Sequence, residues 1–175
     1  MILGAEVFFA RDGASDSPST VSKTHKPASD SAAWLSLGKV LDFSFTPKID
    51  ELIIRAPVDG GGHYEDDETI VTGQQLLFSF TLKQHSELTF ESIFLGEGAV
   101  TLGTAFTPLK QAEKIKGFFK ITAADQTDTG ILENYLWANF SVEQLQMAEK
   151  QYQVKVNGRV LSNSLNTIKV EDWTA

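Results

Sequence analysis

Hydrophobic and polar residues alternate along much of this chain. In one clear example Leu41, Phe43 and Phe45 are apolar, while Asp42 and Ser44 between them are polar. Side chains of a β-strand point alternately to its two faces, so a period of two predicts strands with one buried face. The alternation therefore favours a protein built mainly from β-strands.

The same pattern, with Gly, Pro, Asn and Asp as boundaries, predicts roughly eight strands. Pro47 cannot donate a backbone hydrogen bond and predicts a turn or a sheet edge. Asn157-Gly158 lies between two alternating runs and predicts a hairpin, because both central positions of such a turn need a positive φ. The expected strands cover residues 2–10, 40–45, 51–56, 69–83, 117–123, 132–147, 151–156, 159–161 and 165–170, with 99–106 left between strand and loop.

The longest alternation runs from Thr69 to Lys83 and predicts a strand that crosses a sheet, with a bend at Gly73. One face of this strand is expected to be apolar and to pack in the core. The residues of this apolar face are Ile70, Leu76, Phe78, Phe80 and Leu82.

The period changes after residue 85 and predicts one short helix over residues 86–95. Ser86 suits the N-cap and Gly96 the position just past the end. Leu88 and Leu95 fall on the face opposite the main apolar stripe, so we expect this helix to have two partners, one of which is another subunit. The main stripe consists of Phe90, Ile93 and Phe94.

Two segments are predicted to be long loops. Residues 11–33 are rich in Ser and Pro and carry almost no large apolar side chain, which favours a flexible loop. Residues 57–69 combine three glycines with an acidic run, which favours a solvated loop or one that docks on a basic patch of a neighbour. The candidate assembly residues in this second loop are Asp59, Gly60, Gly61, Gly62, Glu65, Asp66, Asp67 and Glu68.

Together these elements predict a single domain over residues 1–175, as a β-sandwich or barrel with one short flanking α-helix and long loops. The chain of 175 residues, 42% of them hydrophobic, is long enough to bury a sizeable core. It contains no cysteine, which excludes disulfides and thiolate zinc sites. We expect no leader peptide and no membrane span, because neither a basic leader nor a long apolar run is seen.

The formal net charge of -8 argues against a nucleic-acid binder, since phosphate neutralisation supplies most of the affinity of such proteins. It is compatible with a surface that DNA slides past. Catalytic motifs are also missing, because no G-x-S-x-G pattern occurs and His25, His63 and His85 are not spaced as metal ligands. The acidic loop lacks the EF-hand pattern, and the three glycines lack a phosphate-binding motif. We therefore expect no enzyme activity, no cofactor and no metal.

Several stretches together resemble the tail tube (major tail) protein family of tailed bacteriophages. The resemblance covers most of residues 34–160 and consists of an order of elements: a Trp and Leu-Gly opening, a strand pair, a long loop, a long strand, a helix and further strands. The stretches are AWLSLGKVLDFSFTPKIDELIIRAPVDGGG, ETIVTGQQLLFSFTLKQHSELTFESIFLG, GFFKI, YLWANFSVE and YQVKVNGRV.

This resemblance implies subunits that form hexameric rings, which stack into a hollow tube in the virion tail after synthesis in the host cytoplasm. The tube would surround a tape-measure protein, end at tail-terminator and tail-tip proteins, and let DNA pass without specific binding. By the same analogy residues 57–69 would contact an adjacent subunit or ring, and residues 11–33 would become ordered on assembly. The helix at 86–95 would lie between subunits.

Two other functions stay open. The first is an Hcp-like tube protein of a contractile or secretion device, which keeps the fold and changes the context. The second is a monomeric β-sandwich binding module, for example for carbohydrate. Such modules present exposed aromatic side chains, whereas most aromatic residues of this chain lie within predicted strands.

Overall fold

The computed structural model describes residues 4–57, 64–82, 103–105, 107–109, 114–124, 130–148 and 151–170. The prediction of a mainly β protein is confirmed, and these described residues contain no helix. The strands are β1 (Gly4–Arg11), β2 (Ser15–Asp16), β3 (Ser19–Thr20), β4 (Leu35–Pro57), β5 (Tyr64–Leu82), β6 (Ile115–Ala124), β7 (Gly130–Ala148), β8 (Gln151–Val160) and β9 (Thr167–Val170).

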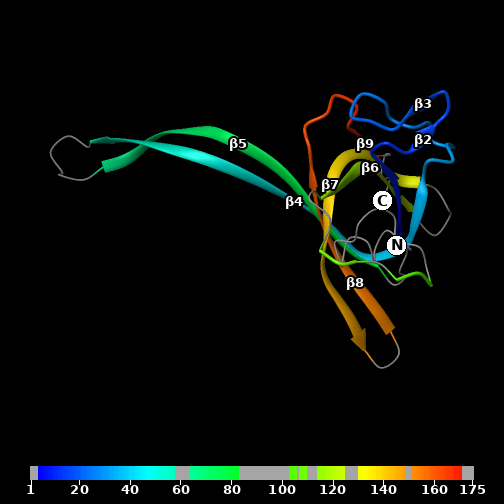
Figure 1. Ribbon diagram of the computed structural model, residues 1–175. Helices are drawn as coiled ribbons and strands as arrows, with labels where there is room; N and C mark the ends of the chain where they lie inside the picture. Colours follow the sequence, from blue (N-terminus) through cyan, green and yellow to red (C-terminus); the bar gives the residue numbers. More distant parts are fainter. Residues whose placement is uncertain are drawn as a thin grey trace.

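Seven of these strands form one large antiparallel sheet in the order β6-β1-β4-β5-β8-β7-β9. The order closes on itself, because β6 also pairs with β7 from Ile115↔Phe140 to Ala124↔Gly130. Side chains of these strands form the main core. We call the described residues outside 47–57 and 64–76 the body, which lies on the right of Figure 1. The small β2–β3 pair forms a separate sheet.

The core of the body is held together by aromatic rings. Phe119 is fully buried and its ring centroid lies 4.8 Å from that of Phe9, 5.0 Å from that of Phe78 and 5.4 Å from that of Phe140. These rings come from β6, β1, β5 and β7, so strands distant in sequence share one cluster. Tilted and edge-to-face ring pairs of this kind add stability beyond the area that they bury.

A second apolar cluster lies on the other face of the same strands. It joins Phe118 of β6 and Trp137 of β7 to Val21 and Ala33, all of them buried. Residues 11–33 were predicted to be a flexible loop with almost no large apolar side chain, but Val21 and Ala33 pack this segment on the body. Two small apolar side chains are enough to anchor the segment, because the sheet supplies the large rings of Phe118 and Trp137 against which they pack.

The segment is also tied together by its own polar side chains. Asp16 accepts a hydrogen bond from the Ser31 hydroxyl at 2.6 Å, and its other carboxylate oxygen lies 2.7 Å from His25 Nε2. The first bond and then the second hold the pKa of Asp16 below its usual value. These two contacts join β2 to later residues of the same segment.

Strand β4 differs from the prediction of two strands separated at Pro47. It runs unbroken from Leu35 to Pro57, and Pro47 pairs with Leu76 of β5. A proline is tolerated here because β4 pairs with β1 only as far as Val40, which leaves β5 as the sole described neighbour of Pro47. The alternative that the sequence allowed, a sheet edge, is the correct one.

Bulges shift the register along β4 and β5. Asp42 has φ 55° at the point where two residues of β4 oppose one of β5. Thr72 is an extra residue of β5 between the pairs Asp50↔Gly73 and Glu51↔Val71. An extra residue moves every following side chain to the opposite face. The prediction that Ile70 shares the buried face of Phe78 is therefore wrong, and Ile70 is exposed.

Gly158 does not form the predicted hairpin. Strand β8 runs straight through Asn157 and Gly158, which pair with Ser141 and Phe140 of β7. A methyl group at Gly158 would overlap the ring of Phe78 on the neighbouring strand. The glycine thus serves close packing in the core instead of a turn.

The other strand predictions agree with the structure within a few residues, including the last one, now β9. On β7, Leu136, Ala138 and Phe140 lie in the main core, and Trp137 lies in the second cluster. The predicted helix at 86–95 lies outside the described residues, and so do residues 99–102 and 106 of the uncertain stretch.

Candidate assembly surface

One part of the sheet extends far from the body as a two-stranded ribbon. We call residues 47–57 of β4 and 64–76 of β5 the arm. Within the described residues, β1 leaves β4 at Val40 and β8 leaves β5 at Leu77. Beyond these points β4 and β5 pair with each other as far as Pro57↔Tyr64. The arm consequently projects from the body with no core of its own (Figure 1).

The arm exposes most of its large apolar side chains, between 39% and 68% of each. Exposed Ile and Leu are unremarkable when scattered singly, but a run of them along one element marks an interaction site. Outside the arm, the described body exposes Leu35, Leu109 and Ile168 at separate places. The exposed apolar residues of the arm are Ile49, Leu52, Ile53, Ile54, Tyr64, Ile70 and Val71.

These side chains lie on both faces of the arm. Residues paired across a ladder point to the same side, and neighbours along a strand point to opposite sides. Leu52 pairs with Ile70, while Glu51 pairs with Val71 and Ile53 pairs with Thr69. We call the side of Ile49, Ile53 and Val71 the first face, and the side of Leu52, Ile54 and Ile70 the second face.

Both edges of the arm are also open in the described structure. The outer edge of β4 beyond Val40 and the outer edge of β5 before Leu77 have no described strand beside them. Unpaired edges present free backbone donors and acceptors, which other strands can extend. The arm thus offers four surfaces, two apolar faces and two edges.

The predicted acidic loop is partly an element of the arm. Glu65, Asp66, Asp67 and Glu68 belong to β5, so residues 64–69 are strand and the prediction of a loop over 57–69 is wrong there. Charged residues disfavour strands in general. Here Arg55 Nε lies 3.1 Å from the Asp66 carboxylate across the ladder, and the charges face solvent instead of a core.

The remaining candidate assembly residues lie outside the described residues. These are Asp59, Gly60, Gly61 and Gly62, which follow β4 in the sequence, and Leu88 and Leu95 of the predicted helix. Of the predicted set, the structure brings together the four acidic residues of β5. The apolar residues of the arm were not predicted, although the run LIIRA within Leu52–Ala56 departs from alternation and signals a strand apolar on two faces.

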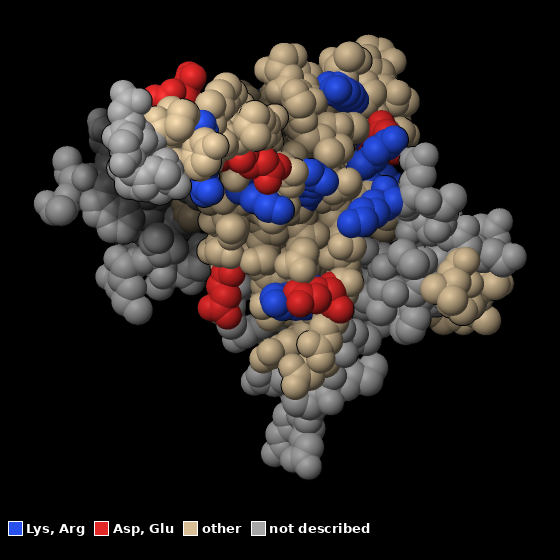
Figure 2. All heavy atoms as spheres, turned by 90° about the vertical axis from the view of Figure 1, so that its left-hand side faces the viewer, with Lys and Arg blue, Asp and Glu red and all other residues tan. Residues whose placement is uncertain are grey.

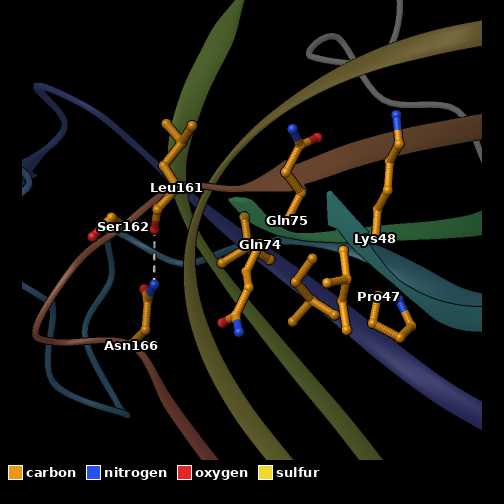
Figure 3. Close-up of a pocket in the computed structure, with 10 residues that line it drawn as sticks. Pro47, Lys48, Gln74, Gln75, Leu161, Ser162 and Asn166 are labelled. Carbon is orange, nitrogen blue, oxygen red and sulfur yellow. Dashed lines mark hydrogen bonds between the residues drawn. The ribbon is translucent and has the colours of Figure 1, made fainter. Parts of the chain in front are cut away.

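A groove lies where the arm meets the body, and Figure 3 shows its lining. Pro47, Lys48, Gln74 and Gln75 come from the arm, while Leu161, Ser162 and Asn166 come from the segment that follows β8. The groove is open and has a volume of about 440 Å3. Asn166 Nδ2 donates a hydrogen bond of 2.9 Å to the carbonyl of Leu161, which holds this segment in shape.

Basic residues gather elsewhere on the molecule. Figure 2 shows Lys and Arg in a band across the described part of one face, with some Asp and Glu beside them. On the body, Lys120 Nζ donates to the carbonyl of Ser29 at 3.0 Å, and Lys26 Nζ lies 4.1 Å from the centre of the Tyr135 ring. Burial, and then the hydrogen bond to Glu133, raise the pKa of Tyr135 to about 12.

The described residues provide little that resembles a catalytic centre. Among them, no three His, Asp or Glu side chains lie close enough together to hold a metal ion. His25 contacts Asp16, and Asp16 contacts Ser31, so the aspartate is central and the histidine does not touch the hydroxyl. This order differs from a nucleophile triad, in which histidine bridges the other two.

In the described part of the chain, no helix is long and apolar enough to cross a membrane.

Comparison with known proteins adds no relative to this picture. No protein-family model matches the chain, and no curated protein shows a significant match to it.

Proposed function

We propose that this chain is a structural subunit that assembles with copies of itself into stacked rings, which form a hollow tube of the phage tail type. The arm is the observation that carries the proposal. It exposes apolar side chains on two faces and leaves two strand edges open. A surface of this kind favours burial against protein.

The rest of the molecule suits such a subunit. The pairing of β6 with both β1 and β7 supports a barrel-like body, and its ring cluster supplies a core that does not involve the arm, which leaves the arm to serve as a connector. In the proposed assembly six copies form a ring, and sheet edges pair between copies. The lumen would hold a tape-measure protein and later pass DNA, and terminator and tip proteins would close the ends. The same assembly in an Hcp-like device is the variant of this proposal in another context.

A monomeric binding module is the second candidate, and the groove at the base of the arm favours it. Pro47 and Leu76 give it an apolar wall, and Gln74 and Gln75 supply amide groups of the kind that bind sugar hydroxyls. This candidate leaves the apolar residues of the arm without a role. We therefore place it second.

The direct test compares the full chain with a variant that lacks the arm. Residues 47–76 are replaced by Asn-Gly, which joins the paired residues Thr46 and Leu77 through a favoured two-residue turn. Size-exclusion chromatography with light scattering and negative-stain microscopy are run over a range of concentrations. The full chain is expected to form rings or tubes, and the variant to remain a folded monomer.

The control is Ile168→Thr, which changes an apolar residue that is 54% exposed on β9, away from the arm. It is expected to assemble like the full chain. A full chain that stays monomeric at high concentration contradicts the proposal, and binding of a sugar to that monomer would favour the second candidate. Tubes formed by the armless variant would show that assembly does not need the arm.

A further inference from the structure

One sequence motif is left without the role that its pattern predicted. Asn157-Gly158 was expected in a hairpin turn, but it lies within β8, between β5 and β7. In an unfolded chain, asparagine followed by glycine is chemically unstable, because glycine has no side chain to hinder attack of its backbone nitrogen on the asparagine side chain. The position of this motif in the sheet therefore decides its chemical lifetime.

The reaction in question is deamidation through a succinimide ring. The backbone nitrogen of Gly158 loses its proton and bonds to Cγ of Asn157. The bond from Cγ to Nδ2 breaks, and the side-chain amide takes up a proton and leaves as ammonia. Water then opens the ring at either carbonyl, which yields aspartate or isoaspartate. The reaction consumes only water, so its rate depends on whether the Gly158 nitrogen can reach Asn157 Cγ.

The backbone of β8 is held on both sides at this point. Gly158 pairs with Phe78 of β5 and with Phe140 of β7. A strand between two others directs each backbone N–H at one of them, so the Gly158 nitrogen is engaged in the ladder. Gly158 is also buried, and a methyl group in its place would overlap the Phe78 ring. Ring closure thus requires β8 to separate from its neighbours.

The side chain of Asn157 is held as well, by a bulge in β7. Glu143 is an extra residue of β7 where the register shifts between Val142 and Gln144. Its carboxylate accepts a hydrogen bond of 2.9 Å from Asn157 Nδ2 and lies 2.8 Å from Lys155 Nζ. The bond from Lys155 and then the bond from Asn157 hold the pKa of Glu143 below its usual value. A bulge that re-aims one side chain in this way ties the Asn157 amide to the next strand.

We propose that Asn157 is a deamidation site that the fold keeps closed and that unfolding of β8 opens. Glu143 is a positioning residue of this site, because it fixes the Asn157 amide through a hydrogen bond. The inference goes beyond the proposed function and does not rest on it, since it concerns a single folded chain.

Either product of the reaction fits β8 poorly. Isoaspartate adds a carbon to the backbone, which moves the residues beyond it out of register with both neighbouring strands. Aspartate places a second carboxylate beside that of Glu143, and like charges on adjacent strands repel each other. We therefore expect a chain that is deamidated while unfolded to refold poorly, so that unfolding becomes irreversible with time.

The test follows Asn157 in the full chain by mass spectrometry of proteolytic peptides. One sample is kept folded in buffer, and the other is unfolded in guanidinium chloride at the same temperature and the same mildly alkaline pH. We expect deamidation of Asn157 to be at least about a hundredfold slower in the folded sample, because a strand paired on both sides opens rarely. Equal rates in the two samples would overturn the proposal.

A variant at Glu143 tests the positioning role. Glu143→Ala is expected to raise the rate at Asn157 in the folded chain by about threefold or more and to leave the rate in guanidinium chloride unchanged. Glu6→Ala is the matched control, because Glu6 accepts a hydrogen bond of 3.3 Å from Ser36 at another exposed position. This control should alter neither rate.

Asn163 lies outside the strands and serves as a reference within the same samples. Its rate in folded Glu143→Ala should equal that in the wild type. A parallel rise at Asn163 and Asn157 would show a general loss of stability, and an unchanged rate at Asn157 would show that its amide is not held. Either result would overturn the role of Glu143.

The comparison of folded and unfolded wild type needs no variant, so it decides whether the fold protects Asn157 even where Glu143→Ala does not fold. Refolding of the unfolded sample is followed by circular dichroism after increasing times in guanidinium chloride. The recovered signal should fall as the deamidated fraction at Asn157 rises. Full recovery by a largely deamidated sample would overturn the expected irreversibility.

Discussion

Strands β4 and β5 run through both the body and the arm, yet the two regions differ in what covers the side chains of these strands. In the body, Phe78, Phe80 and Leu82 of β5 are buried against β1, β6, β7 and β8. A few residues earlier the same strand exposes Ile70 and Val71. The backbone pairing of β4 with β5 continues through both regions. Strand pairing alone therefore does not decide burial, and the number of neighbouring strands does.

Because of this difference, apolar side chains of the body and of the arm should contribute unequally to the free energy of unfolding. Side chains of the body contribute to the free energy of unfolding, because folding of one chain removes them from water. Apolar side chains of the arm gain little from that folding. Within the described residues nothing buries them further, so we expect substitutions there to change the free energy of unfolding much less than substitutions in the body.

The largest expected effect comes from a substitution that leaves a large cavity in the body. Phe119→Ala removes a fully buried ring that contacts Phe9, Phe78 and Phe140. We expect a loss of about 3–5 kcal/mol in the free energy of unfolding, measured by urea denaturation of the monomer. Leu52→Ala on the arm is the counterpart and should change this quantity by less than about 0.5 kcal/mol. Equal losses for the two variants would contradict the distinction.

A second change is expected to strengthen the body. Asn134 on β7 is fully buried, and neither atom of its side-chain amide has a hydrogen-bond partner in the described structure. Because Leu has a similar size and no polar group, Asn134→Leu should raise the free energy of unfolding by about 1–2 kcal/mol. Chemical denaturation measures this change, and Asn139→Leu at a less buried position of the same strand serves as control. A destabilised Asn134→Leu variant would mean that the amide has a bound partner.

The smallest effect concerns the segment at 11–33 and depends on pH. The pKa of Asp16 is lowered in the folded chain, first by the Ser31 hydrogen bond and then by the His25 contact. A lowered pKa means that the folded state favours the carboxylate, so its contribution is present above the unfolded pKa of about 4 and is lost as the pH falls below it.

We therefore expect the stability of Asp16→Asn to decline less steeply than that of the wild type below about pH 4. Melting temperatures measured across pH 2–6 follow this difference, where the pH values are an approximate window around the unfolded pKa. Asp66→Asn on the arm is the matched comparison, because its partner Arg55 is exposed and such surface pairs contribute about 0–1 kcal/mol. Parallel pH profiles for Asp16→Asn and the wild type would show that the Asp16 carboxylate does not contribute to this loss of stability.

Alternation along the chain predicted the β class and most strand positions, since each half-buried strand has its own local pattern. It failed where a distant residue decides the local structure. Gly158 looks like a turn residue until the Phe78 ring of a neighbouring strand is placed above it. Pro47 looks like a break until the missing strand on its outer edge is known.

The sequence predicted only part of the candidate surface, again because distant parts of the chain decide which of its side chains are buried. The acidic residues from Glu65 to Glu68 stand out in the sequence, although their strand conformation does not. Leu52 and Ile53 are as apolar as core residues, so sequence alone favours burial for them. Their exposure follows from the absence of a third described strand at the arm, which is a property of the whole topology.

Thr72 and Asp67 are extra residues of β5, the second between the pairs Ile54↔Glu68 and Arg55↔Asp66, and they have one more consequence. Each bulge increases the local right-handed twist of a ribbon, and a small rotation near the root becomes a large displacement at the far end. Removing Thr72 would therefore re-aim the whole projection while leaving its composition unchanged. In the proposed assembly, the angle at which this projection meets a neighbouring copy would change with it.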